Sequence, residues 1–205
     1  MILMIGLRLG VNAQSARNNE LHLYGSVGVK FLQSKSFSYA ANISPSIASA
    51  IGGGAIWQKS NFQFGGEFFY TNATKHIAGY RSAYSGVNIN FVGGYRVDLD
   101  NTFRLSIQSG IGYSLNHMYI SDESLVSHDH ISTDIFHNNN YSIPVSVMLQ
   151  RVHSRGTFMG LKVGYNFNIN TNHWKYMEGT TTHHFTTGSD GLFVQLILGG
   201  LMQLE

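Results

Sequence analysis

One pattern runs through most of the chain: apolar and polar residues alternate at a period of two, and short polar stretches interrupt the alternation. A β-strand with one apolar and one polar face produces this period, because successive side chains point to opposite faces. In one segment Val87, Ile89 and Phe91 share a face, and the asparagines between them share the other. Eight such segments occur, at residues 21–31, 47–58, 62–71, 87–99, 103–116, 141–150, 159–170 and 192–205.

The length and the two faces of these segments predict a barrel in a membrane. A membrane strand needs about 9–11 residues, whereas soluble strands usually have about 5–6, and each segment reaches the membrane length. The apolar faces carry bulky residues such as Phe64 and Leu105, whereas the polar faces carry Asn, Gln, Ser and Gly. Eight strands enclose a narrow interior that side chains fill, so we expect the small and polar residues inside and the bulky ones against lipid.

The fold class that follows is all-β, an eight-stranded antiparallel up-and-down transmembrane β-barrel. We expect the segment 192–205 to pair with the segment 21–31, because closure removes the exposed strand edges that lipid cannot satisfy.

The composition excludes several other classes of protein. Charged residues are only 12% of the 205 residues, about half the usual share of roughly 25%. A net charge of +2 with histidine neutral is too small to indicate a nucleic-acid partner. The chain has no cysteine, which excludes disulfides, thiolate metal sites and cysteine nucleophiles.

The connections between the segments alternate between short and long. The short ones are 59–61, 100–101 and 153–156, and the long ones are 32–46, 72–83, 117–140 and 171–190. Outer-membrane barrels have short periplasmic turns and longer extracellular loops. This alternation predicts four long loops on the cell surface.

The first residues are typical of an export signal. A short apolar core at 1–7 is followed by Val11-Asn12-Ala13, which fits the pattern of a cleavage site. We therefore predict a signal peptide over residues 1–13 and an outer-membrane barrel over residues 14–205. The alternative is that this segment forms a buried first strand.

With these segments laid out, the chain resembles the small outer-membrane barrels of the OmpA/OmpX type. The sequences FVGGYR at 91–96, GIGY at 110–113 and the NAQ at 12–14 look more specifically like the porin-like proteins with an outer membrane protein β-barrel domain that occur in Bacteroidetes. The resemblance implies a location in the bacterial outer membrane and assembly by the barrel-insertion machinery. It implies no single activity.

Ten histidines raise the question of a metal site, and most of them lie in the predicted loops. His128 and His130, with carboxylates nearby, are the weak candidates for zinc or copper ligands. Spacing within a loop fixes no coordination geometry, so we expect a solvated polar loop, no metal site and no cofactor.

An enzymatic role on outer-leaflet lipid would need a hydroxyl and an imidazole aimed at the same place. Ser114 and His117 lie close in sequence, but their parity places them on opposite faces of a strand. We therefore expect no catalytic residues and no enzyme.

A group of charged residues falls on the polar faces and therefore inside the predicted barrel. A lone charge in a narrow lumen costs several kcal/mol, so these groups should be paired and hydrogen-bonded. Glu67 is expected near the middle of the lumen, where it should accept from Lys162 or an arginine. The charges assigned to the lumen are Lys30, Glu67, Arg96, Asp98, Arg104 and Lys162.

The leading hypothesis for function is a structural or surface-interaction role, such as adhesion or recognition, through the four extracellular loops. A narrow porin-like conduit for small solutes is the alternative, and an outer-leaflet lipid-modifying enzyme is a third. The expected partners are outer-membrane lipid and lipopolysaccharide, the assembly machinery and a surface ligand of unknown identity. We expect a monomer that binds no nucleic acid.

Overall fold

The computed structural model describes residues 19–32, 45–77, 79–122, 133–153, 156–169, 175–176 and 191–204. The predicted signal peptide lies outside these ranges. No helix in the described part of the chain is long and apolar enough to cross a membrane. The strands are β1 (Asn19–Phe31), β2 (Ile47–Lys59), β3 (Phe62–Ile77), β4 (Tyr80–Asp98), β5 (Phe103–Asp122), β6 (Thr133–Val152), β7 (Thr157–Asn168), β8 (Lys175–Tyr176) and β9 (Gly191–Gln203).

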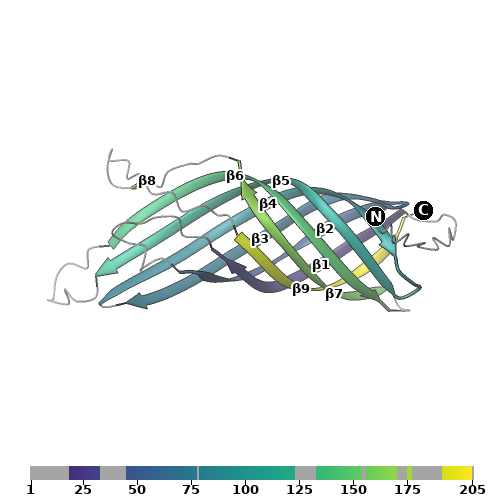
Figure 1. The fold of residues 1–205 in the computed structure, drawn as a ribbon, viewed down its shortest axis with the longest axis horizontal. Helices are drawn as coiled ribbons and strands as arrows, with labels where there is room; N and C mark the ends of the chain where they lie inside the picture. The colour runs from purple at the N-terminus through teal and green to yellow at the C-terminus, as the bar shows by residue number, and fades with distance from the viewer. Residues whose placement is uncertain are drawn as a thin grey trace, which may run out of the picture.

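Eight of these strands wind into one closed antiparallel barrel (Figure 1), so the predicted fold class is confirmed. Each strand from β1 to β6 pairs with the next one, and β7 pairs with β9. The expected closure of the first segment on the last is also confirmed, because β1 pairs with β9 from Glu20 opposite Gln203 to Lys30 opposite Phe193. The two-residue β8 only adds to the edge of β6.

The three short turns lie at one end of the barrel, which we call the turn end, together with Asn19 and Gln203. The turn between β4 and β5 is held by Asp100, whose carboxylate accepts the backbone N–H groups of Thr102 and Phe103 at 2.6 Å each. These backbone hydrogen bonds, the one from Phe103 first, lower the pKa of Asp100 below its usual value of 3.8.

At the opposite end four strands continue past the others, and here two predicted loops are wrong. Residues 72–77 and 80–83 extend β3 and β4, and residues 117–122 and 133–140 extend β5 and β6. The strands β3 to β6 therefore project as a sheet beyond the barrel, toward the left in Figure 1. We call this end the sheet end and the extension the projecting sheet.

The projecting sheet escaped the sequence prediction because its outward positions are mostly polar, so it lacks the outward apolar face of the barrel strands. Ala73, Met118 and Phe136 point inward and are buried, whereas the outward positions carry residues such as Asn72 and Thr74. An apolar outer face is needed only where lipid covers the strand, so the outward apolar signature ends where the bilayer ends.

The outer face of the barrel is a belt of exposed apolar side chains. Phe91, Ile111 and Leu198, for example, are 72%, 64% and 63% exposed, and exposed apolar side chains lie on all eight barrel strands. A monomeric protein in water rarely exposes so large a continuous apolar surface. Aromatic pairs lie near both ends of the belt, as expected for interfacial girdles. They are Trp57–Phe64, Phe62–Tyr95, Tyr113–Tyr141 and Tyr165–Phe167.

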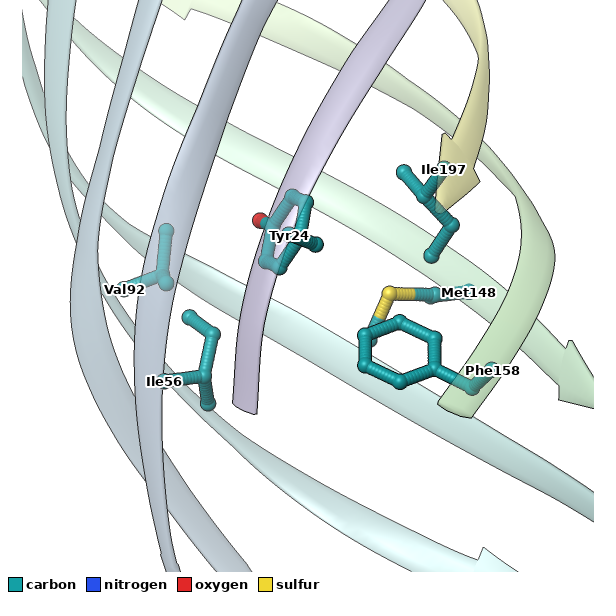
Figure 2. Packing of buried hydrophobic residues seen from close by; sticks show 6 residues of the cluster. All are labelled: Tyr24, Ile56, Val92, Met148, Phe158 and Ile197. Carbon is teal, nitrogen blue, oxygen red and sulfur yellow. The ribbon is translucent and has the colours of Figure 1, made fainter. Parts of the chain in front are cut away.

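The expectation that bulky apolar residues all face lipid is wrong, because two apolar clusters fill parts of the lumen. The lower apolar cluster consists of Tyr24, Ile56, Val92, Met148, Phe158 and Ile197 (Figure 2). The upper apolar cluster consists of Ala48, Ala73, Tyr84, Met118 and Phe136. Large side chains are used inside because polar residues alone would leave buried hydrogen-bonding groups without partners.

Candidate functional site in the lumen and on the projecting sheet

The lumen at the turn end is closed by a group of ionic side chains that we call the mouth cluster. Glu20 Oε2 accepts from Arg104 Nη1 at 2.9 Å, from Arg96 Nη1 at 3.0 Å and lies 3.2 Å from His22 Nε2. Asp98 Oδ1 lies 3.0 Å from Arg96 Nε and 3.7 Å from Arg104 Nε. The structure thus brings together three of the charges assigned to the lumen from sequence, Arg96, Asp98 and Arg104, and Glu20 pairs with both arginines.

Glu20 and His22 were not among the predicted site residues. Glu20 precedes the segment in which alternation was detected, but it has the same parity as His22, and this parity was the available signal. What the sequence does not give is their distance to Arg96 and Arg104, since 76 and 84 residues separate these arginines from Glu20.

Above the mouth cluster, a chain of glutamine amides runs inside the lumen from β5 to β2. Gln108 Nε2 donates to Gln63 Oε1 at 3.3 Å, and Gln63 Nε2 donates to Gln58 Oε1 at 3.1 Å. Gln58 Nε2 in turn donates to the carbonyl of Ser60 at 2.7 Å. Gln63 is satisfied on both sides by its neighbours, whereas the buried Gln108 Oε1 has no protein hydrogen-bond partner among the described residues, so this layer has room to bind water.

The lower apolar cluster comes next. Its six side chains converge on the interior from strands on several sides of the barrel (Figure 2), and each is 7% exposed or less. Met148 lies beside the ring of Phe158, and the ring of Phe158 contacts that of Tyr24 at a centroid distance of 6.4 Å. A plug of this kind opposes the passage of ions, because an ion there would lose its hydration without gaining a polar partner.

At mid-lumen an acid is held by two donors. Lys162 Nζ and the Tyr24 hydroxyl both donate to Glu67 Oε1. Lys162 is 1% exposed and Glu67 is 4% exposed. The structure therefore places Lys162 from β7 against Glu67 from β3, and the tyrosine of the lower apolar cluster supplies the second hydrogen bond.

A cavity of about 20 Å³ lies farther toward the sheet end, lined by Lys30 and several polar side chains. Among the described residues, Asn88 Nδ2, Asn166 Oδ1 and Gln195 Oε1 have no protein hydrogen-bond partner and all three side chains line it. A volume of this size holds about one water molecule. The cavity is therefore a place for bound water and is too small for an organic solute.

The upper apolar cluster covers the sheet end of the lumen. Within it the Tyr84 hydroxyl donates to Asn116 Oδ1 at 2.7 Å, so the polar atom of this ring is satisfied inside the barrel. Met118 and Phe136 are 2% and 6% exposed and shield this bond from the outside. Taken together, ionic, amide, apolar and mixed layers of the described side chains occupy the lumen, apart from the small cavity beside Lys30.

The projecting sheet has an edge that extends past its neighbouring strand. β2 pairs with β3 only as far as Ser49 opposite Asn72, whereas β3 continues along β4 to Ile77. On the other side, β8 covers β6 at Phe136 and His137. The backbone N–H and C=O groups along a strand edge can receive a further strand.

The predicted loop candidates His128 and His130 lie outside the described residues. In the residues that are described, no three side chains of His, Cys, Asp or Glu gather as metal ligands. Ser114 is buried in the lumen, whereas His117 lies on the outer face of β5. The structure therefore does not bring this hydroxyl and imidazole together.

The closed barrel, its apolar belt and its lumen of buried polar and apolar side chains define a membrane-spanning β-barrel of the outer-membrane type, because a bilayer accepts strands only when no edge is exposed to lipid. This chain is an outer-membrane β-barrel. No protein-family model and no curated protein matches its sequence.

Solved structures with the same fold cover most of the chain at low identity. A major outer membrane protein from Thermus thermophilus has a TM-score of 0.58 and 8% identity over 89% of this chain and 99% of that one. Neisserial surface protein A has a TM-score of 0.56 and 10% identity over 90% and 97%. Ail, the attachment invasion locus protein of Yersinia pestis, has a TM-score of 0.55 and 8% identity over 91% and 100%.

Proposed function

We propose that this protein is a surface-interaction protein, in which a closed barrel anchors the projecting sheet outside the cell. The observation that carries the proposal is the contrast between the two parts: the lumen is filled, and the four strands β3 to β6 continue beyond the lipid-facing belt. Strands that cross a membrane do not need this extra length, since about 9–11 residues suffice, and β5 and β6 each have 20.

The filled lumen argues against a conduit as the main role. A solute would have to pass the mouth cluster, the lower apolar cluster and the pair Glu67–Lys162, each held by direct side-chain contacts. Opening such a path would break a buried ion pair, which costs about 3–5 kcal/mol when one partner is lost. We therefore place the conduit second and the lipid-modifying enzyme third.

The projecting sheet offers two kinds of contact to a partner. Its outer face is mostly polar, with Tyr119 as an exposed aromatic residue, and β3 continues for several residues past the end of its pairing with β2 at Asn72. An extended segment of another protein could add to such an edge through backbone hydrogen bonds. The names of two structurally similar proteins, an attachment invasion locus protein and a surface protein, are consistent with a role at the cell surface.

In this proposal the turn end faces the periplasm, and lipopolysaccharide and other outer-membrane lipids surround the belt. The protein is a monomer that the barrel-insertion machinery assembles, and its surface ligand is to be identified. Binding of nucleic acid has no support in the low net charge of +2.

Single cysteines test the orientation, because the chain has none of its own. Thr74→Cys, on the outer face of the projecting sheet, should react with a membrane-impermeant maleimide on intact cells. Asn101→Cys, in the exposed turn between β4 and β5, should react only after the cells are permeabilised. The reverse pattern would contradict the proposed orientation.

Adherence tests the role itself. Replacing residues 76–81 with Asn-Gly would shorten the β3–β4 hairpin to a two-residue turn between Lys75 and Ser82, which already face each other. Cells that express this variant should adhere less to an epithelial monolayer than cells with the full-length protein. Unchanged heat-modifiable migration on gels would show that the barrel remains folded, and unchanged adherence with a folded barrel would refute the role.

A further inference from the structure

Two histidines face each other on the outer surface of the projecting sheet. His117 on β5 and His137 on β6 are direct partners in the antiparallel register. Their sequence neighbours Asn116, Met118, Phe136 and Asn138 are buried, so both imidazoles point to the outer face, where each is half-buried.

The register that brings the two histidines together is fixed from the inside. Met118 is opposite Phe136 and Asn116 is opposite Asn138, and all four residues are 6% exposed or less. A slip of one residue would turn this buried set outward, so the pairing is strongly specified. The two imidazoles therefore sit on a rigid base, unlike histidines that are merely close in sequence within a loop.

The hydrogen bonding of the pair leaves a nitrogen atom available. His137 Nδ1 is buried and has no hydrogen-bond partner among the described residues. A buried polar atom without a partner is destabilising, so such an atom in a folded protein points to a water molecule or an ion. Directly opposed imidazoles would also repel each other if both were protonated.

We propose that His117 and His137 bind one divalent transition-metal ion between them. Cβ atoms of directly opposed residues lie roughly 4.5–5.5 Å apart, and two imidazole nitrogens that each bind zinc at about 2.0–2.1 Å fit within that span. Imidazole selects zinc, copper and nickel over magnesium and calcium. The inference does not depend on the proposed adhesive role.

The site has two protein ligands, since no third His, Cys, Asp or Glu joins them in the described part of the chain. The remaining coordination positions are therefore open to water or to a ligand from another molecule, as in metal sites that keep exchangeable positions. The dissociation constant should lie in the micromolar range, and binding should weaken as the pH falls because protons compete for the imidazole nitrogens.

Titration of the purified, folded protein in detergent micelles with zinc and nickel tests the site. His117→Asn and His137→Asn should each weaken one binding event at least tenfold, and the double variant should weaken it little further, because either change destroys the shared site. His76→Asn is the matched control: His76 lies on the same sheet but is opposite Arg81, and this change should leave the binding event intact.

Copper provides a second readout that is independent of affinity. Electron paramagnetic resonance of the copper complex should indicate two nitrogen ligands in the unchanged protein and one in either single variant. The proposal is overturned if the double variant binds metal as the unchanged protein does. It is also overturned if the binding event disappears in His128→Asn/His130→Asn instead, which would locate the metal in the loop.

Discussion

Replacing Glu67 with alanine is the sharpest test of how the lumen is held together. The carboxylate of Glu67 accepts from Lys162 and from Tyr24, and both charged side chains are almost fully buried. Without Glu67 the ammonium group of Lys162 remains in a closed lumen. Removing one partner of a buried pair costs about 3–5 kcal/mol, a large part of a typical free energy of unfolding of about 5–15 kcal/mol.

Urea unfolding of the protein in lipid vesicles, followed by tryptophan fluorescence, measures this cost. Asp98→Ala is the contrasting variant, because the Asp98 side chain is 48% exposed and pairs with arginines at the barrel mouth. A pair in contact with solvent contributes about 0–1 kcal/mol. We therefore expect Glu67→Ala to lower the free energy of unfolding several times more than Asp98→Ala.

The double variant Glu67→Leu/Lys162→Met tests the same buried pair by removing both charges at once. Replacing a whole buried ion pair with apolar groups is often neutral or stabilising, so the double variant should recover most of the stability that Glu67→Ala loses. If Glu67→Ala is within about 0.5 kcal/mol of the unchanged protein, or if the double variant is no more stable than Glu67→Ala, the reasoning about the buried pair is wrong.

Three further predictions follow from the same structure. Tyr24→Phe should lower the free energy of unfolding by about 1.5–3 kcal/mol in the same assay, because it removes a hydrogen bond to the charged Glu67. A decrease below about 0.5 kcal/mol would show that this hydrogen bond is not formed. Gly110→Ala should destabilise the barrel by about 1–3 kcal/mol, because a Cβ there would lie 1.9 Å from the carbonyl oxygen of Phe91. Gly66→Ala is the control and should be tolerated, because its Cβ would lie 3.9 Å from the nearest atom. If both variants lower the free energy of unfolding equally, the strands do not approach closely at Gly110. The stability that Asp100 contributes should be full above its unfolded pKa and should disappear as the pH falls through its lowered folded pKa. The difference in the free energy of unfolding between the unchanged protein and Asp100→Ala should therefore shrink in acid. A difference that does not depend on pH would contradict the hydrogen bonds that the Asp100 carboxylate accepts in the turn.

The strands and their faces could be predicted from sequence because lipid imposes a simple rule on each of them. In β2, for example, Ile51 and Trp57 point outward, and the buried Ala50 and Gln58 point inward. The same rule fails wherever lipid is absent. The extensions of β3 to β6 have mostly polar outer faces, so their strand character was hidden in segments that were predicted to be loops.

The interior of the barrel was less predictable than its surface. Alternation indicates which residues share a face, but it does not give the shear that decides which faces meet across the lumen. Arg96 and Arg104 could be assigned to the interior by parity, whereas their common acceptor Glu20 is set by three-dimensional register. Ile56 and Phe158 were missed as interior residues because an apolar residue on a mostly polar face has no signature of its own.

The central claim is that the belt of apolar side chains faces lipid while the projecting sheet stands in water, and spin labels on β5 test it most directly. Labels can be placed on single cysteines at Ile107, Ile111 and Tyr119, which are 58%, 64% and 40% exposed, because the chain has no other cysteine. In lipid vesicles, oxygen should relax the labels at 107 and 111 strongly and a water-soluble nickel complex should not, whereas the nickel complex should reach the label at 119. Access of the nickel complex to 107 and 111 would contradict a membrane-spanning barrel.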